Sequence, residues 1–396
     1  MRPVAKLTAL RYVTVSGAMP MPVGDMLEGA LNEFSSEGAP LTSGDLLILS
    51  EYVRINHSLQ RLDLSNADIG PEGIEALASA MRLQRTIETL DISGNPACAA
   101  ANNDTPDALE PLRAFTLLGN ALNENTNLQT LKTHKLAFPV AMLHAWKNAL
   151  RVKLVDFSNS SRGVLPRALH ESLYDTDVAV IARMLKGAPV DALDLSGNRI
   201  TDHGCNCLAK VLMDPLGSSA RLTLVQLRDL DLSSNLIGSG GCKELGRALR
   251  HNSNLRRLNL SDNKINVNGA RHIAGILSAG RPGQRAAAAA EVDSLWQSNY
   301  LSSLETLILS DNPLGAQGVR RIAAHLGDGG GHEPGRLTHL DLSGTGAHAE
   351  GGVALGGMLK HNNHLRVLEL RGANLSEQED GGNHSDDAMR EIGAGK

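Results

Sequence analysis

The cysteines and histidines are the residues of this chain whose types and spacing could bind a metal ion. The run His203-Gly-Cys205-Asn-Cys207 places one imidazole and two thiols within a single short segment, and these groups are the usual ligands of zinc. Residues two apart on a helix point to different sides, so a helical run would not gather them around one ion. We therefore expect no metal ion and no cofactor.

A disulfide is the second kind of chemistry that these cysteines could provide. Cys205 and Cys242 each follow a glycine at the same place of two successive sequence repeats. Neighbouring packed helices lie about 8–10 Å apart, whereas a disulfide needs Cα atoms within about 7 Å. We expect Cys205 and Cys242 to be stacked buried thiols, and Cys98 and Cys207 to be reduced as well.

Patterns typical of catalysis or nucleotide binding do not stand out elsewhere. Segment 327–335 is rich in glycine, but it lacks the Lys-Ser/Thr of a phosphate loop and does not follow a strand, so we interpret it as a linker. His251 and His361 lie at expected helix ends, where a solvated role is the default. We therefore predict that the protein is not an enzyme and has no small-molecule substrate.

The elements that position these residues come from a repeat. In the copy that starts at Val190, apolar residues stand at i, i+3 (Leu193) and i+5 (Leu195), asparagine at i+8 (Asn198), and an apolar residue at i+10 (Ile200). Alternate side chains of one short strand enter the core, and the asparagine amide bonds backbone groups where the chain turns. Copies start at Leu10, Leu59, Ile87, Leu128, Val152, Val190, Leu227, Leu255, Leu304, Leu337 and Leu365.

A second half-pattern follows the asparagine in the same register. Gly204 comes six residues after Asn198, and Leu208 and Leu212 follow it four residues apart. Apolar residues at this spacing form one buried stripe of a helix, and the small residue lets the helix approach the strand. Several repeats are 28 residues long, a length typical of repeats that contain a helix. The sequence therefore predicts an α/β solenoid, a horseshoe with a parallel sheet on its concave face and helices on its convex face.

The two linked half-patterns resemble the ribonuclease-inhibitor type of leucine-rich repeat over roughly Leu59 to Leu375. Ribonuclease inhibitor, Ran GTPase-activating protein, tropomodulin and the sensor regions of NOD-like receptors share this type. The resemblance implies the fold. It implies no single function, because these relatives inhibit, activate, cap and sense.

Length and composition set the expected organisation. The 396 residues are expected to form one continuous solenoid rather than separate domains. We predict an N-terminal cap at 1–58, with a divergent first strand near Leu10 to Val15 and a covering helix at Leu46 to Val53. The repeat array is expected at 59–375 and a flexible tail at 376–396. The net charge of −5 gives no general attraction to nucleic acid or to an anionic membrane, and no apolar stretch approaches the about 20 residues of a membrane span.

A column of acidic residues follows from the repeat, because position i+4 of each strand faces solvent. Aligned on neighbouring strands, these carboxylates would form a negative stripe suited to a basic protein surface. Its acidic members are Asp63, Asp91, Asp156, Asp194, Asp231, Asp341 and Glu369. The alternative is a solvated face whose charges are neutralised by neighbouring arginines. Leu-Asp-Leu-Ser is a common sequence in repeats of this type, so the aspartates need not indicate a binding surface. Flanking cations are available at Arg61, Arg228, Arg256, Arg257 and Arg366.

Departures from the regular repeat length mark expected insertions at 96–117, 158–176, 213–221, 278–300 and 327–336. The first two flank the short repeat at Leu128. They either border one binding surface or flank a degraded repeat whose Phe138 and Trp146 fill a gap. In the fourth insertion, Trp296 and Tyr300 either anchor a partner or hold the loop against the solenoid.

We therefore expect a non-catalytic scaffold that binds a protein partner through its concave face and its insertions, with no nucleic acid and no membrane span. The alternatives are a structural subunit of a cytoskeletal or ciliary assembly and, by resemblance, a GTPase-activating regulator of a small GTPase. Reduced cysteines and the lack of a signal peptide favour the cytoplasm, with the cytoskeleton or cilium as variants. The candidate partner-binding residues are Asp63, Asp91, Asp156, Asp194, Asp231, Asp341, Glu369, Arg228, Arg256, Arg257, Trp296 and Tyr300.

Overall fold

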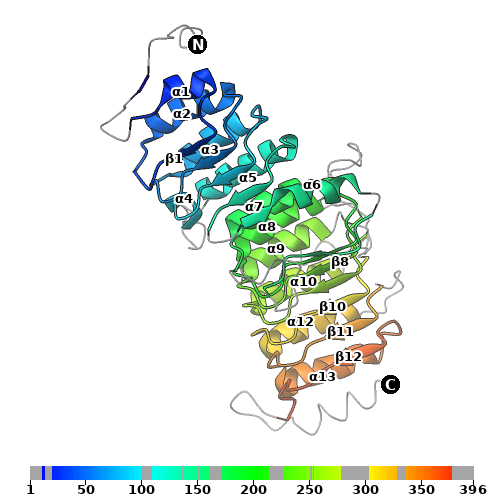
Figure 1. The fold of residues 1–396 in the computed structure, drawn as a ribbon. Coiled ribbons are helices and arrows are strands. Elements are labelled where there is room, and N and C mark those ends of the chain that lie inside the picture. Colours follow the sequence, from blue (N-terminus) through cyan, green and yellow to red (C-terminus); the bar gives the residue numbers. More distant parts are fainter. Residues whose placement is uncertain are drawn as a thin grey trace, which may run out of the picture. The chain divides into compact units, whose positions relative to one another are not determined.

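The structure is a computed structural model, and it divides the chain into two compact units. The first unit comprises residues 1–150 and 166–188, and the second comprises 151–165 and 189–396. In each unit, helices cover one face of a sheet (Figure 1); we call the other face of each sheet its open face. The residues that the structure describes are 11–13, 20–99, 109–134, 137–149, 151–159, 172–213, 226–249, 252, 254–277, 303–327 and 336–376.

The first unit has a five-stranded sheet in the order β1-β2-β3-β4-β5. Its strands are β1 (Glu33–Ser35), β2 (Arg61–Asp63), β3 (Thr89–Asp91), β4 (Thr130–Lys132) and β5 (Ala137–Pro139). Its described helices are α1 (Val23–Glu28), α2 (Ser43–Ile55), α3 (Pro71–Met81), α4 (Pro96–Ala99), α5 (Leu109–Glu124), α6 (Val140–Asn148) and α7 (Asp175–Met184).

The second unit has a seven-stranded, parallel sheet that runs in chain order from β6 to β12. Its strands are β6 (Val155–Asp156), β7 (Ala192–Asp194), β8 (Asp229–Asp231), β9 (Arg257–Asn259), β10 (Thr306–Ile308), β11 (His339–Asp341) and β12 (Val367–Glu369). Its described helices are α8 (Asp202–Leu212), α9 (Ser239–Leu249), α10 (Val267–Leu277), α12 (Gly315–Gly327) and α13 (His348–Leu359).

The predicted repeat is confirmed strand by strand. Every repeat from Leu59 to Leu365 has its strand at positions i+2 to i+4, and only β6 is one residue shorter. The leucine at i+3 points into the core, as Leu193 and Leu230 do with 1% and 0% exposure. Neighbouring repeats pair in parallel at equivalent positions, for example Leu193 with Leu230. The expected α/β repeat fold is therefore present in both units, on two separate sheets.

The repeat asparagines hold neighbouring repeats together. Nδ2 of Asn235 donates to the carbonyl oxygens of Leu195, Leu232 and Ser233, each at 3.0 Å. Its Oδ1 accepts from the backbone N–H of Ile200 in the preceding repeat, also at 3.0 Å. Buried polar backbone groups need such partners. The equivalent ladder continues through Asn95, Asn198, Asn263 and Asn312.

A second asparagine column, which the sequence analysis did not identify, lies three residues before the strand-starting leucine. Oδ1 of Asn252 accepts from the backbone N–H groups of Asn254 and Leu255, and its Nδ2 donates to the carbonyl of Leu212 in the preceding repeat. Asn125 and Asn362 do the same in their repeats. The Asn-x-x-Leu spacing was visible in the sequence and could have indicated this return turn.

The N-terminal cap differs from the expectation at its first strand. The parallel neighbour of β2 is β1, at Glu33–Ser35, and not the segment from Leu10 to Val15. Val13 instead forms an isolated antiparallel bridge with Met21. The prediction of a first strand near Leu10 was therefore wrong. The true first strand, β1, was hard to recognise because it contributes only Phe34 to the core, between two exposed residues. The covering helix is present as α2, with Leu46, Leu49 and Val53 buried.

The repeat that starts at Leu128 breaks the parallel order. Leu136 stands where a turn-forming asparagine would be, and β5 runs back antiparallel to β4 with Phe138 opposite Leu131. Phe138 is 1% exposed and fills the core as the degraded-repeat interpretation expected, whereas Trp146 on α6 is only half-buried. The expected insertion at 96–117 ends early, because α5 begins at Leu109.

The four cysteines of the chain are buried and unbridged. Burial and the nearby carboxylate of Asp202 raise the pKa of the Cys242 thiol well above its ordinary range, so it stays protonated. A Cβ at Gly241 would lie 2.7 Å from Cγ2 of Ile237 and 3.2 Å from Cβ of Cys205. Helix α9 therefore approaches its own turn and helix α8 closely only because residue 241 has no side chain.

Candidate functional site

The acidic column lies on the open faces of both sheets, one residue per strand. In the second unit, Asp156, Asp194 and Asp231 are register partners on β6, β7 and β8. The column continues through Asn259, Ile308, Asp341 and Glu369. In the first unit, the same positions are Asp63, Asp91 and Lys132. The strands therefore align these side chains as the sequence predicted, in two separate groups.

The aspartates and Asn259 of the column each accept a hydrogen bond at the end of their own strand. One carboxylate oxygen of Asp231 accepts from both the backbone N–H and the hydroxyl of Ser233, at 3.0 and 2.6 Å. The amide oxygen of Asn259 likewise accepts from the backbone N–H and the hydroxyl of Ser261, so a neutral amide can replace the carboxylate in this role. The bond to the residue two positions on recurs at Asp63, Asp91, Asp156, Asp194 and Asp341. Local structure therefore uses one oxygen and leaves the second for other contacts.

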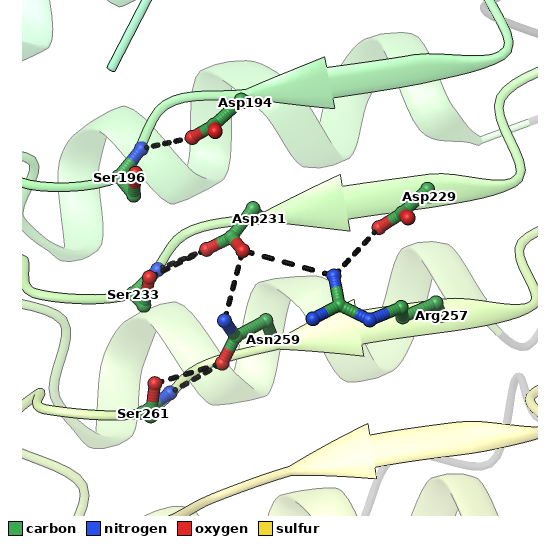
Figure 2. A network of polar contacts seen from close by, with 8 residues as sticks. All are labelled: Asp194, Ser196, Asp229, Asp231, Ser233, Arg257, Asn259 and Ser261. Carbon is green, nitrogen blue, oxygen red and sulfur yellow. Dashed lines mark hydrogen bonds and ion pairs between the residues drawn. The ribbon is translucent and has the colours of Figure 1, made fainter. Parts of the chain in front are cut away.

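The second oxygen of Asp231 belongs to a polar network on the open face (Figure 2). It accepts from Nδ2 of Asn259 at 2.8 Å and lies 3.7 Å from Nη1 of Arg257. The same guanidinium nitrogen lies 3.1 Å from Asp229. Arg257 thus neutralises part of the charge on β8, which is what the self-neutralised interpretation expected of a flanking arginine.

The other flanking arginines do not neutralise the column in the described parts of the chain. Arg61 pairs with Glu33 and Arg256 with Glu305, neither of which is a column residue. Arg228 and Arg366 have no described ion pair there. Elsewhere in the column, Lys132 pairs with Asp91 at 3.1 Å, and His339 and Arg371 lie 3.2 and 3.1 Å from Glu369.

Asp156 and Asp194 are adjacent carboxylates of the column without a described ion pair. Within the described ranges neither residue has an ion pair with a basic side chain. The two carboxylates are register partners on neighbouring strands and therefore lie side by side. Burial raises the pKa of Asp194, and the carboxylates of Asp231 and Asp156 on either side raise it further, while the bonds from Ser196 act in the opposite direction. These two residues therefore form an uncompensated negative patch at the β6 edge of the seven-stranded sheet.

Replacing Asp194 with asparagine is expected to stabilise the second unit at neutral pH. The folded pKa of Asp194 lies above its unfolded value, so its favourable contribution is complete below about pH 3.9 and is lost as pH rises through the folded pKa. An amide keeps the bond to Ser196, as Asn259 shows, and removes the repulsion. Urea unfolding should show a gain of about 0.5 kcal/mol at pH 7 that disappears near pH 3.5.

Asp341 is the matched control for this substitution, because one of its register neighbours is the uncharged Ile308. Asp341→Asn removes a carboxylate from the same strand position with less repulsion to relieve, so its gain should be smaller. Equal gains for the two variants, or a loss of stability for Asp194→Asn, would show that repulsion within the column is not what destabilises the carboxylate.

Other predicted site features have a mixed outcome. Trp296 and Tyr300 lie outside the described residues, as do all of insertion 278–300, most of insertions 158–176, 213–221 and 327–336, and the tail beyond Ser376. His203, Cys205 and Cys207 are on α8 as expected, and the described residues contain no group of three or more potential ligands that could hold a metal ion. None of the helices found in the described ranges is both long and apolar enough to cross a membrane.

Comparison with known proteins places these observations in a family context. Residues 56–78, 190–209, 226–246, 251–274 and 300–323 match a family model described as "Leucine Rich repeat". The chain is 25% identical over 261 residues to the ribonuclease inhibitor of Sus scrofa, which covers 60% of this chain and 51% of that protein. About half of that relative is therefore spanned.

Two further relatives are larger proteins. The chain is 26% identical over 243 residues to NACHT, LRR and PYD domains-containing protein 5 of Bos taurus, covering 61% of this chain and 20% of that protein. It is 27% identical over 213 residues to NACHT, LRR and PYD domains-containing protein 4C of Mus musculus, covering 53% of this chain and 19% of that protein. The chain spans about one fifth of each.

Proposed function

Because this chain is a leucine-rich repeat protein with repeats of the ribonuclease-inhibitor type, we propose that it acts without catalysis, as a binding module for a protein partner with basic side chains. Repeat solenoids offer extended surfaces built from successive strands. The observation that carries the proposal is the uncompensated pair of carboxylates, Asp156 and Asp194, on the open face of the seven-stranded sheet.

A lysine or arginine side chain suits this patch both through its cation and through its aliphatic part. Its cation would relieve the repulsion within Asp156, Asp194 and Asp231, because an opposite charge at close range favours the ionised carboxylate. Leu154, two residues before Asp156 and on the same face of β6, is 50% exposed. The aliphatic part of a lysine or arginine can cover such an apolar side chain while its charged end reaches the carboxylates.

The proposal predicts how a partner is released. Immobilised wild-type protein, exposed to an extract of its source cells, should retain a basic protein that elutes as ionic strength rises, because salt screens exposed charges. The same partner should elute as pH falls through the raised pKa of Asp194, because the protonated carboxyl no longer attracts a cation. Retention that survives both high salt and low pH would contradict recognition through the acidic patch.

The other functions expected from the sequence remain predictions. A structural role in a cytoskeletal or ciliary assembly and the regulation of a small GTPase draw no additional support from the described residues. A cytoplasmic location is likewise still a prediction. Each of them is compatible with a protein-binding module, so identification of the retained partner by mass spectrometry also separates these alternatives.

A further inference from the structure

Three irregular segments of the first unit meet around His134. Nε2 of His134 lies 3.0 Å from the carbonyl oxygen of Cys98, the third residue of α4. Its Nδ1 lies 3.4 Å from Oδ2 of Asp177, in the first turn of α7. His134 itself follows β4 by two residues. One imidazole therefore contacts elements that are far apart in sequence.

The contact with Cys98 determines where the first proton of His134 resides. A carbonyl oxygen can only accept a hydrogen bond, so Nε2 must carry a hydrogen. In the neutral ring, Nδ1 would then present a lone pair to the carboxylate of Asp177. Nδ1 is shielded from solvent, and so water cannot separate the two acceptors. In the imidazolium, by contrast, Nδ1 carries a hydrogen and donates toward Asp177.

The carboxylate of Asp177 accepts two hydrogen bonds from its own neighbourhood. Its Oδ1 accepts from the hydroxyl of Thr133 at 2.7 Å, and its Oδ2 accepts from the backbone N–H of Tyr174 at 2.9 Å. The side chain is 1% exposed and occupies the third position of α7, where the helix dipole favours negative charge. Among the described residues, the ion pair of this buried carboxylate is with the imidazole of His134.

Of the other described groups around His134, Tyr174 favours its charged form, and Cys98 and Lys132 do not oppose it. The ring of Tyr174, next to the start of α7, stacks on it with centroids 4.5 Å apart and an interplanar angle of 30°, an arrangement that stabilises a cation. From α4, the Cys98 thiol is neutral, because burial and the carboxylates of Asp177 and Asp91 raise its pKa well above its ordinary range. On β4, the charge of Lys132 is balanced by Asp91 of β3.

We propose that His134 and Asp177 form a pH-sensitive clasp: the imidazolium of His134 joins α4 and the end of β4 to the start of α7, and loss of its proton loosens these contacts. Asp175, the first residue of α7, is also buried at this end of the helix. The clasp fastens the chain at one end of each of the two irregular segments that flank the repeat at Leu128.

The sign of the pH dependence follows from the charged contact. Because the folded state holds the imidazolium better than the unfolded chain does, the stability contributed by the clasp is complete below the unfolded histidine pKa of about 6.5. That stability is lost as pH rises through the higher pKa of the folded state. The first unit should therefore be most firmly held in mildly acidic solution and looser in alkaline solution.

The test compares wild-type protein with His134→Gln and Asp177→Asn. In an NMR titration, His134 of the wild type should titrate at least one pH unit above the ordinary value of about 6.5. In Asp177→Asn it should return to that value or below it. Between pH 5.5 and 8.5, the unfolding equilibrium constant of the wild type should rise about tenfold more than that of His134→Gln, since one pKa unit corresponds to a factor of ten.

His57→Gln is the matched control, because His57 is an exposed histidine of the same unit. That variant should keep the pH dependence of the wild type. The clasp is overturned if His134 titrates at or below the ordinary value in the wild type, or if His134→Gln and His57→Gln show the same pH slope. The NMR titration decides the matter on wild-type protein alone if His134→Gln does not fold.

Discussion

Replacing Asn235 with alanine is expected to lower the free energy of unfolding of the second unit by about 3 kcal/mol. The substitution removes one side chain that satisfies the carbonyl oxygens of Leu195, Leu232 and Ser233 and the N–H of Ile200. These groups belong to two successive repeats, and Asn235 itself is 5% exposed. Buried polar groups that lose their partners are expensive, and alanine gives them none. Guanidinium unfolding followed by circular dichroism measures the loss.

Thr345 provides the comparison that isolates this effect. It occupies the same repeat position, is 1% exposed, and its hydroxyl donates at 2.6 Å to the carbonyl oxygen of Leu342. Thr345→Ala therefore removes one described hydrogen bond, and a loss of about 1 kcal/mol is expected. If Asn235→Ala costs no more than Thr345→Ala, the asparagine ladder is not what couples neighbouring repeats.

Charge reversal at Asp194 and Asp231 is expected to weaken the complex with a basic partner by at least about a hundredfold. The double substitution to lysine replaces attraction by repulsion at Asp194 of the acidic patch and at its register partner Asp231. The neutral pair Asp194→Asn with Asp231→Asn keeps the bonds to Ser196 and Ser233, as Asn259 does to Ser261. It should weaken binding by about tenfold. Isothermal titration with the purified partner gives both values.

The matched control changes the net charge equally on the other face of the same unit. Glu244 lies on α9, half-buried and paired with Arg247, and Glu350 is exposed on α13, so both belong to the helix layer. Their joint replacement by lysine should leave affinity nearly unchanged. If this control weakens binding as much as the reversal on the open face, the partner responds to overall charge and the acidic patch is not its binding site.

The regular part of this fold could be predicted from the sequence because its determinants are local and repeated. Leu193, Leu195 and Asn198 each have one physical role, and their counterparts recur at the same offsets in every regular repeat. The alignment of Asp194 with Asp231 followed directly from this register. Which carboxylates of the column are neutralised could not be predicted from this register. That depends on the directions in which individual side chains such as Arg257 and Lys132 point.

The irregular part could not be predicted, because its contacts join residues without a common spacing. Leu136 signalled a missing turn, but nothing in the sequence indicated that β5 would fold back on β4. The contacts of His134 with Cys98 and Asp177 cross long stretches of chain that contain the expected insertions. The packing of α7 against α5 is equally without a sequence signal, although a Cβ at Gly119 would lie 3.0 Å from Cα of Val180.

The repeat that begins at Val152 has an evolutionary consequence. Its strand β6 is part of the second unit, whereas its helix α7 is part of the first. Arrays of this kind change length when recombination duplicates or deletes whole repeats, and stacking then restores the core. Removing this one repeat would take a strand from one unit and a helix from the other. Whole repeats should therefore be gained or lost only in the regular stretches on either side of it, and the repeat at Val152 should be retained.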